Sequence, residues 1–412
     1  MADAKAEAPE TSRRWESMAK NLDLQNKTIH NMSLPSGSKF KFEQFLLLRV
    51  LWKEHENIKS VLVPGMKDWI ERATEMLRQY KSWSTYCASF QTPEDSPEGT
   101  FAIARYYQRE AAKTENKADP GTFFTPISAR TRSAVDADKD LHKGLHGLSL
   151  GSPKTPSRPG RAPLPRLPDL DDELASDDDS IQHLITSTST SPSPITLISP
   201  IPAELRNLLY PRSKDEQIVN TALIVFLNAL TIHFPLSLKW TLHRKAFVAL
   251  FENTQFEART DGYLDSPGGN PKVIIEVKAA LRSSNLLPIQ MQESAQMVAW
   301  IKSDTELARK TNTTYAPILS YSIADYKANT INRRFHISQD RHQVYITVAQ
   351  YDEKYLEYIV DGKLSPDRSF LTMNQYGPWD TTEGGHMRVL GPILLAIALR
   401  AEQEGKEEES EN

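Results

Sequence analysis

Cysteine is almost absent from this sequence, since Cys87 is the only one in 412 residues. A single thiol excludes an intrachain disulfide and a cysteine-based metal site, which suits a reducing compartment such as the nucleus or cytoplasm. Long hydrophobic runs are also lacking: residues 221–234 and 389–399 are the longest, and both fall short of the roughly 20 apolar residues of a membrane-spanning helix. The N-terminus shows no apolar segment typical of a secretory signal. We therefore expect an intracellular protein with no membrane contact.

A strong charge of one sign is missing as well. The formal net charge is -4, so no overall basic field attracts nucleic acid. Any such contact must come from a local group of cations, because phosphate contacts need cationic side chains and little else. The candidates, with ordinary surface residues as the alternative, are Lys239, Arg244, Lys245, Arg282, Arg333, Arg334 and Arg341.

Composition and periodicity divide the chain into successive parts. We expect a flexible tail over residues 1–14, a small helical region over 15–130, a linker over 145–202, an α/β domain over 203–402 and an acidic tail over 403–412. The linker is rich in Pro, Ser and Thr and carries an acidic run, so it cannot bury enough apolar surface to offset the entropy of ordering. It is predicted to be disordered.

The N-terminal region contains two helical patterns, over residues 38–55 and 65–83. In the second, Met66, Trp69 and Ile70 begin an apolar stripe that recurs every three or four residues. Two interpretations stay open: helices that brace the following domain, or a helical module that binds a partner.

The α/β domain begins with a helical pattern over residues 215–234 and continues through strands, a second helix and further strands to a final helix. This order predicts a mixed β-sheet with helices on its faces. The expected strands cover residues 240–251, 255–264, 272–281, 317–326, 342–352 and 354–362, and the later helices cover 289–310 and 388–404.

The strand pattern VIIEVKA contains two opposite charges. Since alternate residues of a strand face opposite sides, Val273, Ile275 and Val277 share one face and point toward the core. Glu276 and Lys278 share the other face.

The dipeptide Gly268–Gly269 favours a tight hairpin turn before this strand. A reversal at that point places Asp261 directly opposite Glu276, with Cβ atoms about 4.5–5.5 Å apart. The prolines on either side of the glycines leave a wider loop open. Like charges that face each other are destabilising, and a divalent cation between them removes the penalty.

Two converging carboxylates with a lysine beside them suit Mg²⁺ or Mn²⁺, which bind through few carboxylates and leave positions for water and phosphate. A bound metal lowers the pKa of a coordinated water, and Lys278 can orient or deprotonate that water. This chemistry fits phosphodiester hydrolysis. The alternative is an exposed charge pair that stabilises little.

The order Asp…Glu-x-Lys is the motif of the PD-(D/E)XK nuclease superfamily, and residues 203–402 resemble its restriction-endonuclease-like domain. They are also similar to the nuclease-like domain of fungal proteins, in which segments like EARTDGYL, IIEVKA and IQMQESAQMVAWI follow in the same order. The resemblance implies a nuclease that acts on nucleic acid, with Asp261, Glu276 and Lys278 as metal and catalytic residues. We expect DNA ahead of RNA as the substrate, and the sequence leaves both open. Thr260 stands where the motif has proline. Many enzymes of this fold act as dimers, which leaves a homodimer open.

The resemblance also implies supporting residues. Glu216 matches an acidic position in the helix before the first strand and is a candidate metal ligand, but Ser213 and Glu216 also match a capping box. Gln292 and Gln296 share one helix face and are candidate catalytic residues that hold a water or a phosphate oxygen. A solvated helix face is the alternative for both glutamines.

A rival function of another class is a non-catalytic module that keeps the fold and binds protein or nucleic acid. Such a module would have lost its catalytic activity, and the complete Asp…Glu-x-Lys set argues against that loss.

Overall fold

The structure is a computed structural model that describes residues 7–55, 65–91, 97–113, 215–311, 331–365 and 367–411. All of these residues belong to one compact unit, which combines residues 1–116 with residues 201–412. The predicted disordered linker (145–202) and the predicted strand over 317–326 lie outside the described residues.

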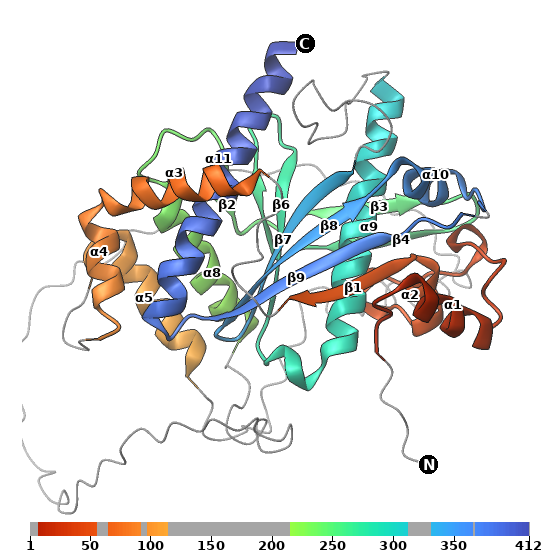
Figure 1. Cartoon of the computed structure of the whole chain (residues 1–412), viewed down its shortest axis with the longest axis horizontal. Helices are drawn as coiled ribbons and strands as arrows, with labels where there is room; N and C mark the ends of the chain where they lie inside the picture. The colour runs from red at the N-terminus through yellow and green to blue at the C-terminus, as the bar shows by residue number, and fades with distance from the viewer. Residues whose placement is uncertain are drawn as a thin grey trace, which may run out of the picture. The chain divides into compact units, whose positions relative to one another are not determined.

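A seven-stranded mixed sheet forms the centre of this unit (Figure 1). Its strand order is β1–β9–β8–β7–β6–β5–β2, with β1 parallel to β9 and β6 parallel to β7. The other neighbouring pairs are antiparallel. The strands are β1 (Val50–His55), β2 (Lys239–Thr241), β5 (Gly262–Asp265), β6 (Pro271–Lys278), β7 (Asn332–Asp340), β8 (Gln343–Tyr351) and β9 (Leu371–Asp380). β3 (Ala246–Leu250) and β4 (Gln255–Arg259) form a separate two-stranded sheet.

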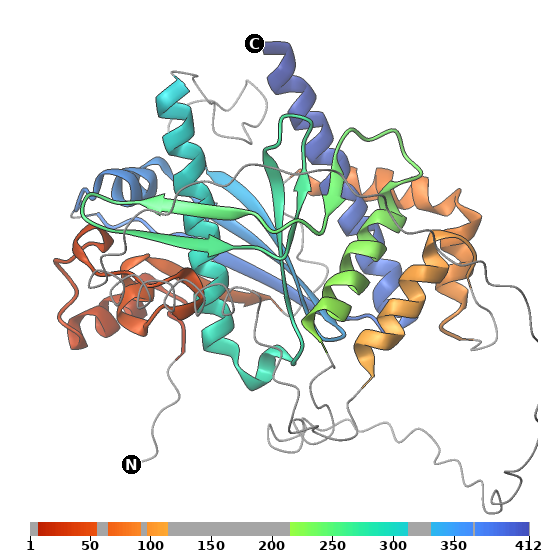
Figure 2. The ribbon, with the colours of Figure 1, turned by 180° about the vertical axis from the view of Figure 1, so that it is seen from behind.

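Helices cover both faces of the large sheet, so the predicted α/β architecture with a mixed, helix-flanked sheet is confirmed (Figures 1 and 2). One layer contains α3 (Met66–Arg78), α4 (Lys81–Ala88), α5 (Thr100–Ala112), α8 (Glu216–Thr231) and α11 (Gly384–Glu411). The other contains α1 (Ser12–Asn21), α2 (Phe42–Leu47), α9 (Leu286–Thr311), α10 (Glu353–Asp361) and the β3–β4 sheet.

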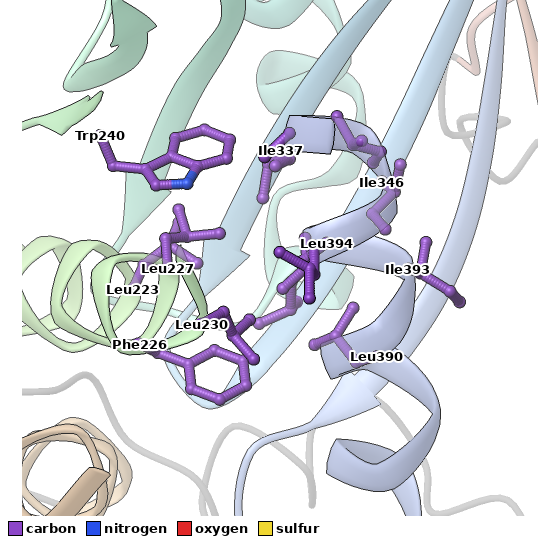
Figure 3. Packing of buried hydrophobic residues seen from close by; sticks show 14 of the residues in the cluster. Leu223, Phe226, Leu227, Leu230, Trp240, Ile337, Ile346, Leu390, Ile393 and Leu394 are labelled. Atoms are coloured by element: carbon purple, nitrogen blue, oxygen red, sulfur yellow. The ribbon is translucent and has the colours of Figure 1, made fainter. Parts of the chain in front are cut away.

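The first layer packs its apolar side chains against the face of β6 that carries Val273, Ile275 and Val277, as the strand pattern predicts. Leu227 of α8 and Leu394 of α11 both belong to the apolar cluster between the two helices and the sheet (Figure 3). The second layer covers the opposite face, where Ile274 of β6 packs in a cluster that includes α9. Both faces of β6 are therefore buried.

The N-terminal residues differ from the prediction because they belong to this unit. Ala8 is buried, and the carbonyl of Pro9 accepts a hydrogen bond from the backbone N–H of Trp52 at 2.9 Å. α1 begins at Ser12, capped by the side chain of Thr11. The flexible tail expected over residues 1–14 is therefore wrong from residue 7 onward.

The helix expected over residues 38–55 is also wrong in its second half. α2 ends at Leu47, Arg49 takes a left-handed backbone conformation (φ 52°), and β1 follows. A left-handed residue cannot continue a right-handed helix, and Val50 favours a strand. The N-terminal region is thus not purely helical, and it supplies an edge strand of the central sheet.

Three further expectations fail locally. The expected strands 240–251 and 255–264 are each split between the two sheets, because the chain leaves the large sheet after β2 and returns to it at β5. Residues 354–362 form α10 instead of a strand, with the side chain of Asp352 capping its start. The acidic residues expected over 403–412 extend the final helix, because α11 runs to Glu411, beyond the helix expected over 388–404. No helix in the described ranges is long and apolar enough to cross a bilayer.

Candidate active site

The hairpin of β5 and β6 has the register that the glycine turn predicts. Gly262 pairs with Ile275, Tyr263 with Ile274, and Leu264 with Val273. The ladder shifts by one residue at Asp265, next to the turn, and Gly269 closes that turn with a positive φ of 74°. Asp261 lies one residue before β5, where the same register continues to Glu276, and it donates its backbone N–H to the carbonyl of Ile275 at 2.9 Å.

Glu276 lies on the predicted face of β6, but that face is not open to solvent. Its exposed fraction is 2%, because α9 covers it. The exposed charge pair considered for Glu276 and Lys278 is thus wrong, and so is the solvated face considered for the glutamines: Gln296 is 1% exposed and Gln292 is partly buried.

Three donors hold the carboxylate of Glu276. The Nζ of Lys278 and the amide of Gln292 both donate to Oε1, and the amide of Gln296 donates to Oε2 at 2.5 Å. Gln296 also donates to the carbonyl of Arg259 at 2.8 Å. The structure thus brings Glu276, Lys278 and both predicted glutamines into direct contact.

Asp261 is fixed from two sides. Its Oδ2 accepts the backbone N–H of Val277 at 3.2 Å, and its backbone carbonyl accepts the amide of Asn220 on α8 at 2.9 Å. Its Oδ1 lies 3.1 Å from the guanidinium of Arg244. The side chain of Asp261 is 13% exposed, so it lies where the site opens to solvent.

The pKa values of Glu276 and Lys278 are shifted by their surroundings. Burial, followed by the nearby charge of Asp261, raises the pKa of Glu276 to about 8. Burial alone would lower the pKa of Lys278, but the charges of Glu276, Glu216 and Asp261 outweigh it and raise that pKa above its ordinary value. Lys278 is therefore a cation at neutral pH.

Glu216 is the first residue of α8, and its charge reaches Lys278. The capping residue of this helix is Asp215, whose side chain accepts the backbone N–H of Gln217 at 2.9 Å. Ser213 lies outside the described residues. The capping-box explanation therefore does not describe this helix start, and Glu216 is exposed next to the site.

The residues present fit a hard cation that keeps much of its water. An ionised carboxylate offers about four lone-pair positions; Glu276 uses three of them in the contacts above. Mg²⁺ is usually bound by one or two carboxylates together with waters and substrate phosphates. Within the described residues no group of three or more His, Cys, Asp and Glu side chains is arranged around a common metal position.

Several cations predicted to lie along a nucleic-acid path are instead buried. Arg282 pairs with Asp340 at 2.6 Å and with Glu293, and it donates to Ser338 at 2.8 Å. Arg334 pairs with Asp304 at 2.7 Å, and Arg341 donates to the carbonyl of Ala112 at 2.6 Å. These arginines hold elements of the protein together and are not available to phosphate.

Arg244 was predicted as a candidate phosphate contact, with an ordinary surface residue as the alternative. Its contact with Asp261 was not foreseen, because no local sequence pattern joins the two residues. A search of protein-family models, of curated proteins and of solved structures finds no match to this chain.

Proposed function

We propose that the chain is a divalent-metal-dependent nuclease of the PD-(D/E)XK superfamily, with a restriction-endonuclease-like fold, that hydrolyses phosphodiester bonds of nucleic acid. One observation carries the proposal: Asp261, Glu276 and Lys278 meet from neighbouring strands beneath two glutamines of α9. The mixed sheet with helices on both faces supports the fold assignment.

Asp261 and Glu276 would hold Mg²⁺ or Mn²⁺, with Glu216 within electrostatic reach as a third acid. When bound, such a cation supplies a coordinated water of lowered pKa and stabilises negative charge on a phosphoryl oxygen. It also offsets the repulsion between the carboxylates, which adds to burial in raising the pKa of Glu276.

Lys278 acts as a cation in this reaction, because its raised pKa keeps the ammonium protonated at neutral pH. It orients the attacking water and offsets the negative charge that builds on the phosphate. In the reaction the attacking water gives up a proton to bulk solvent as its oxygen bonds to phosphorus. The bond from phosphorus to the leaving sugar oxygen breaks, and that oxygen takes a proton from solvent. Gln292 and Gln296 keep the carboxylate of Glu276 in place during these changes.

Nucleic acid, DNA before RNA, is the substrate we propose, with a homodimer and a nuclear or cytoplasmic location as parts of the same proposal. A cation that stays exposed next to Asp261 supports it, since the side chain of Arg244 is 53% exposed and contacts Asp261. Lys239 is also exposed, on edge strand β2 opposite Asp265. Arg282, Arg334 and Arg341 take no part, since they are buried.

A second function is favoured by the same contacts. The Glu276 carboxylate already has three donors without any metal, as expected of a module that keeps the fold but has lost activity and binds protein or nucleic acid. A metal that binds only the folded state raises its melting temperature. If the chain is a metal-dependent nuclease, millimolar Mg²⁺ or Mn²⁺ should raise its melting temperature. If it is a binding module without a metal site, the melting temperature should not change.

The test is a cleavage assay on labelled DNA and RNA with Mg²⁺ or Mn²⁺, using the full chain. We expect Lys278→Ala and Asp261→Asn each to lower the cleavage rate at least about 100-fold, as for loss of one group that stabilises the transition state. The control is Lys67→Ala, which removes an exposed lysine of α3 and should leave the rate within about two-fold. Cleavage that survives both site variants contradicts the proposal.

A further inference from the structure

Arg244 occupies a defined place beside the candidate metal position. It lies in the connection between β2 and β3, next to Lys245, whose carbonyl accepts the backbone N–H of Thr260 at 3.0 Å. This bond holds the connection against the residue that precedes Asp261. The guanidinium of Arg244 then reaches Oδ1 of Asp261 at 3.1 Å.

This ion pair does little for stability. The side chain of Arg244 is 53% exposed, and exposed pairs of this kind contribute little because water and salt screen them. The position of Asp261 is already fixed by Val277 and Asn220. Arg244 instead supplies positive charge. Together with Lys278, it faces a group of three acids: Glu216, Asp261 and Glu276.

We infer that Arg244 is a substrate-contacting residue that exchanges partners, pairing with Asp261 in the free protein and with the phosphate of the nucleic acid in the loaded site. The inference rests on the proposed function. A divalent cation at Asp261 repels a guanidinium 3.1 Å from the same carboxylate. An exposed arginine can then turn toward a phosphate oxygen, which its planar donor fork fits in a bidentate manner.

The neighbouring lysine is a poor substitute for this role. The Nζ of Lys245 donates to the carbonyl of Gly269 at 2.9 Å and lies 5.7 Å from the ring centre of Tyr263. These contacts direct Lys245 toward the hairpin turn and away from Asp261. Arg244 is thus the residue of this connection placed to meet a phosphate next to Asp261.

Two measurements on the full chain test the exchange, and they are expected to move in opposite directions. Arg244→Ala removes the competitor for Asp261, so it should bind Mn²⁺ about two- to five-fold more tightly by calorimetry, the range set by an exposed ion pair. The same variant loses a phosphate contact, so its single-turnover cleavage rate at saturating Mn²⁺ should fall about 100-fold. Arg244→Lys should keep part of the rate, because a lysine contacts phosphate only as a point charge.

Arg78→Ala is the matched control, since it removes an exposed arginine that pairs with Glu75 on α3, and it should change neither quantity. If the wild-type chain binds Mn²⁺ and cleaves, but Arg244→Ala behaves like the control or binds Mn²⁺ more weakly, the exchange is refuted and the proposed nuclease stands. If the wild-type chain neither binds Mn²⁺ nor cleaves, the proposed function fails and the role of Arg244 fails with it.

Discussion

Glu276 is a buried carboxylate whose surroundings both oppose and support its charge. Burial and Asp261 raise its pKa, whereas Lys278 and Gln296 favour the ionised form. The protein thus keeps at this point a carboxylate that a cation can recruit, held in one orientation by the amides of α9. A group under such opposing influences is typical of a functional site.

His336 provides a pH test at the scale of a single residue. It is fully buried on β7, and burial followed by the charges of Arg282 and Lys278 lowers its pKa to about 3. The folded state thus keeps His336 neutral between pH 6.5 and 3, while the unfolded chain takes up the proton. The stability that neutral His336 contributes is therefore fully present above pH 6.5 and is lost progressively as the pH falls toward 3.

We expect the stability of the wild-type chain to fall by up to about 1.4 kcal/mol more per pH unit, between pH 6.5 and 4, than that of His336→Leu. Urea unfolding at a series of pH values measures both slopes. Equal slopes would show that His336 takes up no proton on unfolding.

At the scale of secondary-structure elements, Arg282 joins four parts of the fold. It follows β6, and its guanidinium contacts Glu293 of α9, Asp340 of β7 and Gln375 of β9. The guanidinium carbon of Arg282 also lies 4.3 Å from the ring centre of Tyr345 on β8. This buried network keeps α9 at a fixed height above β6, and so presents Gln292 and Gln296 to Glu276.

Arg282→Ala leaves two buried carboxylates without their partner. We expect a loss of about 3–5 kcal/mol in the free energy of unfolding, the usual cost of breaking a buried ion pair. The control is Arg78→Ala, which removes an exposed partner of Glu75 on α3 and should change stability by less than about 0.5 kcal/mol. Similar losses in the two variants, measured by urea unfolding at pH 7, would argue against the network's role.

The elements predicted correctly from the sequence are those with local signals. Alternation in VIIEVKA and the glycine turn predict β6 and its register, and the helix expected over 289–310 falls within α9. β7 was missed because His336, Ser338 and Asp340 interrupt its apolar pattern. These polar residues are tolerated inside because Arg282, more than 50 positions away, satisfies two of them.

The same limit applies to the candidate site. The acids, Lys278 and the two glutamines could be found because a strand and a helix each place them by simple periodicity. Arg282 was misassigned to the surface, since nothing near it in the sequence indicates a partner for its charge. The contact of Arg244 with Asp261 depends on the path between β2 and β3, which no periodicity specifies.

At the scale of the whole molecule, residues 1–116 and 201–412 build one unit. β1 extends the sheet beside β9, and α5 packs against α8. If residues 201–412 were separated from these partners, apolar surfaces of β9 and α8 would be exposed to solvent. We therefore expect residues 201–412 alone to lack cooperative thermal unfolding, and co-expression with residues 1–116 to restore it. A cooperative transition of the isolated segment would contradict this integration.

The most direct test of the central claim is a crystal structure of the full chain soaked with Mn²⁺, with the metal located by anomalous scattering. We predict one strong peak bound by carboxylate oxygens of both Asp261 and Glu276, with Lys278 beside it and the guanidinium of Arg244 moved off Asp261. A fully soaked crystal without a peak between these two carboxylates would contradict the assignment of a metal-dependent nuclease.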